Sequence, residues 1–462
     1  MSGDKHFDVA IIGSGSGNSI PDERFAGMSV ALFEEGAQFG GTCLNVGCIP
    51  TKMFVYAAEV AQTIRDSARY GIDTTTPTVR WTDIVGRVFD RLDPLSVGGR
   101  NYRETGSGNV TLFSGHASFV GLKTIATGTG EIVTADQIVV AAGSRPVIPQ
   151  QVLGSGVPFH TNDDIMRLPA QPRHLVILGS GYIAAEFAHV FSALGTKVSI
   201  VARKDGLLRN LDTDISDRFT ALAQKNWDVR LNTDAPIAIS EDGQDGLALP
   251  DGTRVLGDAL LVAVGRTPNG DRIGAQAGGI ELDHHGRIVV DEFGRTTAEG
   301  VYALGDVSSK FQLKHVANHE ARVIRENLLT HAWNNPATLQ AFDHRFVPAA
   351  VFTHPQIAQV GMTETQARDA GLDIAVKIQN YSDVAYGWAM EDREGFCKII
   401  AQRRTGKLLG AHIIGEQAPT LIQPLIQAMS LGTNATDMAR GQYWIHPGLP
   451  EVVENALLGL DI

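Results

Sequence analysis

Cys43 and Cys48 are the residues of this chain whose types and spacing most clearly indicate chemistry. They are separated by four residues in the run Gly-Gly-Thr-Cys-Leu-Asn-Val-Gly-Cys-Ile-Pro, about thirty residues after a glycine-rich turn of the nucleotide-binding type. A structural disulfide is one alternative, but no secretory signal is evident, and cytosolic disulfides are usually catalytic or redox-sensing. A zinc half-site is disfavoured because no second Cys or Cys/His pair stands at ligand spacing. The pair therefore predicts a redox active site beside a cofactor.

The first glycine-rich turn has the features of a dinucleotide site. Gly13, Gly15 and Gly17 follow a short apolar strand, and Glu34 stands at the end of the next one. Glycines let a backbone approach a pyrophosphate at a helix N-terminus, and an acid about 20 residues later accepts hydrogen bonds from a ribose. Asn18 takes the place of the third glycine of the motif, and the following segment carries a proline and polar residues. We therefore expect a bound dinucleotide and a first helix that is short or distorted.

A second turn of the same kind indicates a second nucleotide. Gly179 and Gly181 follow an apolar strand, and Ala202 stands where the first turn has its acidic residue. Arg203 follows it directly, and Arg209 stands six residues further on. An acid at this position favours NAD, whereas its absence beside arginines favours the 2′-phosphate of NADP. Solvated surface arginines are the alternative, but their place at the strand end leads us to predict NADPH.

Length and composition set the limits of the fold. The chain has 462 residues, of which 43% are hydrophobic and 19% are charged, as in an ordinary globular protein. This length suggests roughly three domains. The net charge of −12 argues against nucleic acid or an anionic membrane as a partner. No apolar stretch reaches the roughly 18 residues that span a bilayer. We read the third cysteine, Cys397, as a structural strand residue.

The run around the cysteine pair, residues 40–50, resembles the class I flavoprotein disulfide reductases, whose pattern is Gly-Gly-Thr-Cys-x4-Cys-Ile/Val-Pro. The resemblance extends over nearly the whole chain. It implies an α/β fold with two Rossmann-like nucleotide-binding domains, for FAD and for NADPH, and a C-terminal α+β dimerisation domain. The segments that it implies are 1–146 for the first part of the FAD domain, 147–268 for the NADPH domain, 269–340 for the second part of the FAD domain, and 341–462 for the interface domain.

The resemblance also assigns roles to individual residues. Lys52 and Glu186 are expected to pair near the flavin, and Asp306 is expected to hold the ribityl and phosphate end of FAD. His315 begins a helix whose N-terminus faces the flavin, and we expect it to pack at that helix start. The residues expected to bind the two cofactors are Gly13, Gly15, Gly17, Asn18, Glu34, Gly41, Thr42, Lys52, Ala142, Gly143, Gly179, Gly181, Tyr182, Ile183, Glu186, Arg203, Arg209, Gly265, Asp306 and His315.

His446 and Glu451 complete the expected catalytic set. Glutamate can hold an imidazole in one tautomer, and histidine exchanges protons near its natural pKa. By resemblance, Cys43 is the thiol that attacks the substrate disulfide and Cys48 the thiol next to the flavin. In related enzymes the histidine reaches the thiols of the other subunit. The resemblance therefore implies a homodimer with active sites shared between its subunits.

The substrate is expected to be a small-molecule disulfide. Lipoamide dehydrogenase is disfavoured by Ala202 and Arg203, and glutathione reductase by the lack of an evident basic cluster after Ile20. Residues 314–320, 383–392 and 441–447 look most like mycothione reductase, which predicts reduction of mycothione in the cytoplasm. Glutathione reductase and lipoamide dehydrogenase stay open as alternatives. A flavoprotein redox sensor without enzyme activity also stays open, although it leaves the cysteine pair and the histidine unexplained.

Overall fold

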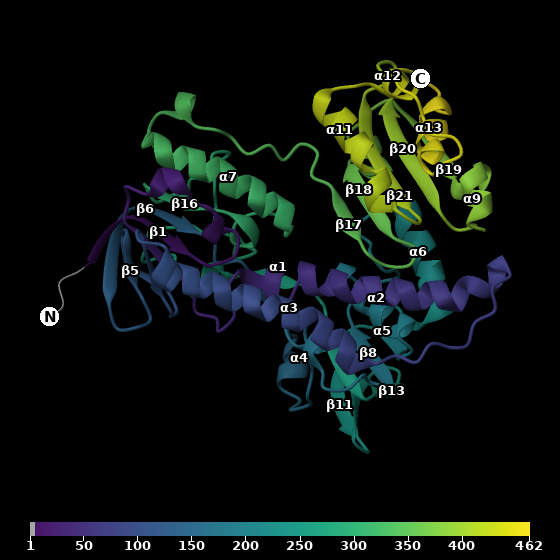
Figure 1. Cartoon of the computed structure of the whole chain (residues 1–462), viewed down its shortest axis with the longest axis horizontal. Helices are drawn as coiled ribbons and strands as arrows, with labels where there is room; N and C mark the ends of the chain where they lie inside the picture. Colours follow the sequence, from purple (N-terminus) through teal and green to yellow (C-terminus); the bar gives the residue numbers. More distant parts are fainter. Residues whose placement is uncertain (1–4) are drawn as a thin grey trace.

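The structure is a computed structural model, and it describes residues 5–462 (Figure 1). Its first sheet is built around five parallel strands in the order β3-β2-β1-β6-β16. Parallel strands are covered on both faces, and the four residues of β2 are accordingly all buried. These five strands are β1 (Lys5–Ile12), β2 (Val30–Phe33), β3 (Val110–Phe113), β6 (Ile132–Val140) and β16 (Val301–Ala303). Two short antiparallel strands, β4 (Ser118–Gly121) and β5 (Thr124–Ala126), extend the sheet beyond β6.

The connection from β1 to β2 contains no α-helix among the described residues. It forms two short 3-10 turns, at Gly17–Ser19 and Glu23–Phe25. Asn18 accepts two hydrogen bonds from the guanidinium of Arg103, one at its side chain and one at its carbonyl, both at 2.8 Å. The expected distortion of the first helix is therefore confirmed, and a buried arginine from a distant segment replaces the missing helical contacts.

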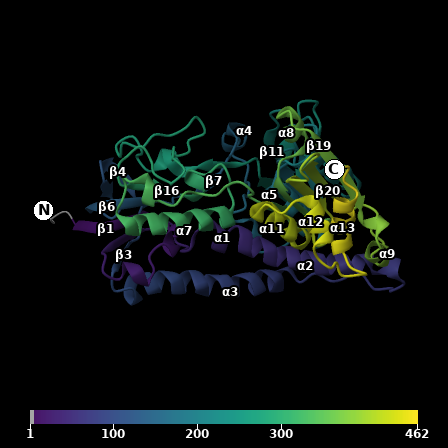
Figure 2. The ribbon, with the colours of Figure 1, turned by 90° about the horizontal axis from the view of Figure 1, so that it is seen from above.

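Two long helices, α2 (Cys48–Asp66) and α3 (Trp81–Asn101), cross from the first sheet to the second (Figures 1 and 2). Phe54 of α2 packs against Trp81 of α3 with ring centroids 5.4 Å apart. Trp81 in turn lies 5.4 Å from Phe191 of α5 (Tyr182–Ala193). This aromatic cluster docks the helix that begins at Cys48 onto the helix of the second nucleotide turn.

The second sheet has four parallel strands in the order β10-β9-β8-β14. They are β8 (His174–Leu178), β9 (Lys197–Val201), β10 (Asp228–Arg230) and β14 (Ala259–Val262), with α6 (Thr213–Asn226) following β9. Two short antiparallel strands, β7 (Ser144–Pro146) and β15 (Arg266–Pro268), pair where the chain passes between the first and second sheets. The domain limits expected from the sequence stay a prediction.

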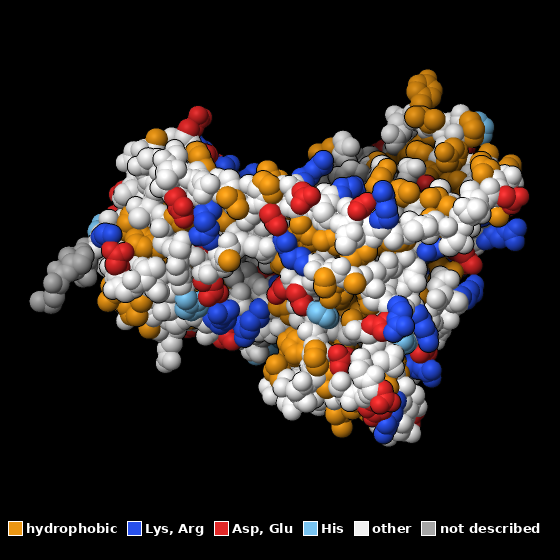
Figure 3. Space-filling model, turned by 60° about the horizontal axis from the view of Figure 1, so that its bottom comes forward, with side chains coloured by type: hydrophobic (Ala, Val, Ile, Leu, Met, Phe, Trp, Pro, Cys, Tyr) orange, Lys and Arg blue, Asp and Glu red, His pale blue; other side chains and the backbone are white. Residues whose placement is uncertain are grey.

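The third sheet is antiparallel, in the order β17-β18-β21-β20-β19. Its strands are β17 (Ala349–Val351), β18 (Ile357–Gly361), β19 (Ile374–Asn380), β20 (Phe396–Gln402) and β21 (Leu408–Ile414), and helices α11 (Gln423–Leu431), α12 (Ala435–Arg440) and α13 (Pro450–Leu458) accompany it. Figure 3 shows hydrophobic side chains gathered at the upper right, over this part of the molecule. Large exposed apolar residues of this segment include Trp388, Leu431, Tyr443 and Ile445. Cys397 is fully buried in β20.

The remaining helices and strands are short, except for the helix α7. They are α1 (Gly41–Asn45), α4 (Gln150–Leu153), α7 (Lys314–Thr330), α8 (Glu364–Asp369), α9 (Ala385–Ala389), α10 (Ala418–Leu421), β11 (Ile237–Glu241), β12 (Gln244–Ala248) and β13 (Arg254–Gly257). The exception is α7, which follows β16 and runs along the first sheet (Figure 1). Within residues 5–462, no helix combines the length and the apolar character that a membrane span would need.

A buried lysine fixes the second sheet to the third. Lys398 of β20 is 2% exposed, and its Nζ lies 2.8 Å from Asp212, 2.5 Å from Asp214 and 2.7 Å from Glu364. Asp212 also caps α6 by accepting from the backbone of Asp214 at 3.2 Å. A buried charge is tolerated only when it is fully paired. The cluster thus ties the start of α6 to the third sheet.

Candidate active site

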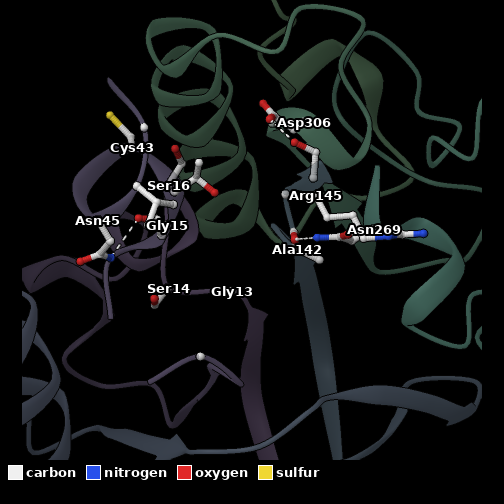
Figure 4. A pocket seen from close by; sticks show the side chains of 18 of the residues that line it. Gly13, Ser14, Gly15, Ser16, Cys43, Asn45, Ala142, Arg145, Asn269 and Asp306 are labelled. Carbon is white, nitrogen blue, oxygen red and sulfur yellow. Dashed lines mark hydrogen bonds between the residues drawn. The ribbon is translucent and has the colours of Figure 1, made fainter. Parts of the chain in front are cut away.

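A cavity of about 810 Å³ opens where the first sheet meets α2 and α5 (Figure 4). Four of its lining residues, Gly13, Glu34, Ala142 and Asp306, stand just after parallel strands of the first sheet. The carboxyl ends of parallel strands are where α/β sheets bind their ligands. The sequence-predicted residues that line the cavity are Gly13, Gly15, Glu34, Gly41, Thr42, Cys43, Cys48, Lys52, Ala142, Gly143, Tyr182, Ile183, Glu186 and Asp306.

The first glycine turn packs closely against the backbone at Gly13 and leaves free space at Gly15. A Cβ on Gly13 would lie 2.3 Å from the carbonyl oxygen of Ala141, at a φ of +107°. A Cβ on Gly15 would meet no heavy atom closer than 3.8 Å. Glu34 accepts hydrogen bonds from the backbone and the hydroxyl of Ser14. The turn therefore has the room and the rigidity to cradle a pyrophosphate, as the sequence predicts.

Asp306 is oriented on the opposite side of the cavity (Figure 4). The Ser144 hydroxyl donates to its carboxylate at 2.6 Å, and Arg266 donates to the same hydroxyl at 2.8 Å. Burial raises the pKa of Asp306 above its usual range. The backbone N–H of Gly305 donates to the buried carboxylate of Glu320 at 2.7 Å. These contacts hold Asp306 toward the cavity, where it can accept hydrogen bonds from ligand hydroxyls.

The cysteine pair stands at the start of two helices, Cys43 within α1 and Cys48 at the first position of α2. Both are free thiols in this structure. A hydrogen bond from Cys43 lowers the pKa of Cys48 to about 7, and the same bond, together with burial, raises the pKa of Cys43. The pair therefore shares one proton in this chain near neutral pH, with the first negative charge favoured on Cys48.

Lys52 and Glu186 form the expected ion pair. The ammonium of Lys52 lies 2.7 Å from Oε1 and 2.6 Å from Oε2 of Glu186, which is 4% exposed. Glu186 also accepts the backbone N–H of Phe352 at 3.0 Å, and Lys52 lies 4.7 Å from the centre of the Phe352 ring. The carboxylate of Glu186, which belongs to α5, thus binds the side chain of Lys52 in α2 and the backbone of Phe352 just after β17.

His446 and Glu451 are paired but lie outside the cavity lining of their own chain. Nδ1 of His446 is 2.7 Å from Oε1 of Glu451, and the backbone N–H of Gly448 donates to Oε2 at 3.1 Å. The hydrogen bond from His446 lowers the pKa of Glu451. The His446 side chain is 71% exposed. The expected tautomer-fixing contact is present, while the contact with the thiols is not made within one chain.

The second turn supplies part of its expected set to the cavity. Tyr182 and Ile183 begin α5 and line the cavity together with Glu186, whereas Gly179, Gly181, Arg203, Arg209 and Gly265 do not. Arg209 pairs with Asp205 at 3.0 Å. Arg203 is exposed at the end of β9 and makes no ion pair within the described part of the chain. The expected residues outside the lining are Gly17, Asn18, Gly179, Gly181, Arg203, Arg209, Gly265 and His315.

His315 lies on the outer side of its helix. It is exposed, and its Nε2 is 2.8 Å from the carbonyl oxygen of Pro348. This backbone contact agrees with the expected packing at the helix start. Its neighbour Lys314, which was not among the expected site residues, lines the cavity instead. Arg266 and Ser144 were missed in the same way, and their only signal was adjacency to the motif residues Gly265 and Gly143.

Comparison with known proteins agrees with this geometry. A family model described as pyridine nucleotide-disulphide oxidoreductase matches residues 7–321, and its dimerisation-domain counterpart matches residues 347–457. The chain is 57% identical to mycothione reductase of Mycobacterium tuberculosis, covering 98% of this chain and 99% of that one. It is 32% identical to glutathione reductase of Burkholderia cepacia, covering 96% and 97%. The solved structure of the HOCl-induced flavoprotein disulfide reductase RclA from Escherichia coli superposes with a TM-score of 0.83 at 27% identity, covering 98% and 99%.

Removing the thiol that donates to Cys48 tests the proton sharing in the cysteine pair. In the Cys43→Ala variant, the pKa of Cys48 should rise from about 7 toward that of a free thiol, about 8.5. Between these pH values Cys48 is mostly thiolate in the reduced parent enzyme and mostly thiol in the variant. Ultraviolet thiolate absorbance followed against pH measures both. Cys43→Ser keeps a donor and should give an intermediate value; an unchanged pKa in Cys43→Ala would contradict the assignment.

Proposed function

Since this chain belongs to the pyridine nucleotide-disulphide oxidoreductase family, we propose that it is the NADPH- and FAD-dependent reductase of mycothione, the disulfide of mycothiol. The chain is an enzyme and an oxidoreductase. The observation that carries the substrate assignment is its far higher identity to a mycothione reductase than to a glutathione reductase, over nearly full length in both cases. A cytoplasmic location stays a prediction from the sequence.

FAD fits the cavity by the chemistry of its lining. The open side of Gly15 and the uncrowded Gly143 leave room for a pyrophosphate, while Glu34 and Asp306 offer carboxylates to ribose and ribityl hydroxyls. When bound, FAD supplies the two-electron transfer between the nicotinamide and the cysteine pair. For NADPH, Arg203 and Arg209 offer positive charges to a 2′-phosphate. Arg203 makes no ion pair within the described residues, and Arg209 pairs with the exposed Asp205 at 3.0 Å.

The cysteine pair performs the exchange with the substrate. His446 takes the proton of Cys43, and the resulting thiolate attacks one sulfur of the substrate disulfide to form a mixed disulfide. The first thiol then leaves with that proton from His446. The Cys48 thiolate then attacks the sulfur of Cys43, which closes the Cys43–Cys48 disulfide and releases the second thiol. Lys52 and Glu186 hold the start of α2, so that Cys48 keeps its place during the exchange.

The proton donor comes from the second subunit of a homodimer. The dimerisation-domain match covers the third sheet and its helices. In its own chain His446 is exposed and separate from the cavity, although its tautomer is already fixed by Glu451. An exposed, pre-oriented histidine beside large exposed apolar side chains is what a shared active site requires. The apolar residues around it include Tyr443 and Ile445.

A turnover panel tests the substrate. Purified enzyme is assayed with NADPH or NADH against the disulfides of mycothiol, glutathione, lipoamide and trypanothione. We expect the highest kcat/KM with mycothione and NADPH, because the chain is 57% identical to a mycothione reductase and 32% identical to a glutathione reductase, and because Arg203 and Arg209 can meet the phosphate. A clear preference for glutathione or lipoamide would sink the substrate assignment. A preference for NADH would overturn the role given to Arg203.

Mixed dimers test the shared site. The inactive variants Cys43→Ser and His446→Ala are unfolded and refolded together, so that dimers with one chain of each kind form. If the site is shared, each mixed dimer has one site with both defects and one with neither, and disulfide reductase activity should return to about half per mixed dimer. Each variant refolded alone is the control. A mixture as inactive as its parents would show that His446 serves its own chain.

A further inference from the structure

The redox loop, residues 43–48, turns the chain from α1 into α2 at Val46 and Gly47. In a helix, the carbonyl of residue i accepts the N–H of residue i+4. The Gly47 carbonyl accordingly accepts the N–H of Thr51 at 3.1 Å and its hydroxyl at 2.7 Å. The Val46 carbonyl has no equivalent partner, because residue i+4 is Pro50, which lacks an N–H. The loop therefore depends on a donor from another segment at Val46.

Asn162 supplies this donor. Its side-chain Nδ2 donates to the Val46 carbonyl at 3.0 Å, and within residues 5–462 no other group donates to this carbonyl. Asn162 lies 116 residues further along the chain, between α4 and β8, and is only 6% exposed. Both residues line the cavity. One buried amide thus ties the redox loop to the segment that leads into the second sheet.

The amide of Asn162 is held in a single orientation. Its Oδ1 accepts from Nη1 of Arg266 at 3.1 Å, and its Nδ2 also donates to the carboxylate of Asp163 at 2.9 Å. A guanidinium can only donate, so the amide oxygen must face Arg266 and the amide nitrogen must face Val46. Two backbone hydrogen bonds of His160, at 2.7 and 2.8 Å, fix the same turn to β14. The donor to the redox loop is therefore rigidly placed.

Arg266 connects this amide to the cofactor side of the cavity. Its Nε donates at 2.8 Å to the hydroxyl of Ser144, which in turn donates to the carboxylate of Asp306 at 2.6 Å. Figure 4 shows Cys43 and Asp306 on opposite sides of the cavity. One guanidinium therefore orients both the carboxylate expected to bind the cofactor and the amide that holds the redox loop.

We propose that Asn162 is a positioning residue that holds the redox loop in the conformation in which the two cysteine sulfurs meet. This rests on the proposed function, in which the pair alternates between dithiol and disulfide. In the dithiol form the two thiols already share a hydrogen bond, so the loop is set for closure. Fixing the loop raises the effective concentration of one thiol at the other.

The contact with Val46 acts mainly on the open form of the loop. Without it, the dithiol loop gains conformational freedom, whereas the disulfide itself still restrains the closed loop. Closing the loop then costs more conformational entropy. Asn162 therefore favours the disulfide over the dithiol.

The stability of the Cys43–Cys48 disulfide tests the proposal without NADPH or a disulfide substrate. The FAD-containing parent and the variants Asn162→Asp and Asn162→Leu are equilibrated without oxygen in mixtures of oxidised and reduced dithiothreitol. The oxidised reagent takes up the two electrons and two protons that the cysteine pair gives up. Acid quenching, alkylation and peptide mass spectrometry then give the fraction of disulfide.

Both variants lack the N–H donor to Val46, and the loss of one hydrogen bond typically changes an equilibrium constant about fivefold to tenfold. The equilibrium constant for forming the disulfide should therefore fall by about this factor in Asn162→Asp and in Asn162→Leu. For a two-electron couple this corresponds to about 20–30 mV.

A matched variant separates this role from a general loss of structure. The side chain of Asn109 also donates to the backbone of a distant segment, at 2.8 Å to Phe25 and 3.1 Å to Met28, but does not line the cavity. Asn109→Asp should therefore behave like the parent. An unchanged equilibrium constant in both Asn162 variants overturns the proposal, even if they unfold more easily in urea. A shift confined to Asn162→Asp would be an effect of its charge on the thiols and would overturn it as well. A failure to turn over mycothione would contradict the proposed function and leave these equilibrium constants unaffected.

Discussion

The carboxylate of Glu186 is the contact on which the arrangement of the molecule depends. It binds the ammonium of Lys52 from α2 at 2.6 Å and the backbone N–H of Phe352 at 3.0 Å, and it belongs to α5, as the fifth residue of that helix. Lys52 lies in the helix that begins at Cys48, Glu186 in the helix of the second nucleotide turn, and Phe352 near the start of the third sheet. A carboxylate that is 4% exposed is stable only because each of its partners is present. Three parts of the chain therefore meet at one buried charge.

This junction explains why the chemistry lies where it does. The nucleotide turn and Asp306 are placed by the ends of parallel strands, which the first sheet supplies alone. The cysteines are placed differently, because Cys48 begins α2 and the direction of that helix is set by its docking on α5 through Phe54 and Lys52. The thiols and the second nucleotide turn are thereby held to one cavity. His446, by contrast, lies outside this cavity, between α12 and α13.

The sequence predicted those features that depend on residues close to one another in the chain. The Gly13 turn and the distorted connection after it are local, so their residue types and spacing were enough. The pairing of His446 with Glu451 was predicted from their spacing together with the family resemblance. The Lys52 and Glu186 pair was reached through the family resemblance, since no spacing rule joins positions so far apart. Lys314 could not be found in this way. Its place in the cavity lining depends on which face of α7 meets the cavity, and that follows from tertiary packing.

The central claim, that the Lys52 and Glu186 pair couples α2 to α5, is tested most directly by a double-mutant cycle. Lys52→Met, Glu186→Met and the double variant are compared with the parent through the free energy of unfolding in urea. We predict a coupling energy of about 1–3 kcal/mol, because each single change leaves its partner unpaired. The exposed pair of Arg80 and Asp83, 3.1 Å apart, is the control and should give less than about 1 kcal/mol. Additive effects at Lys52 and Glu186 would contradict the claim.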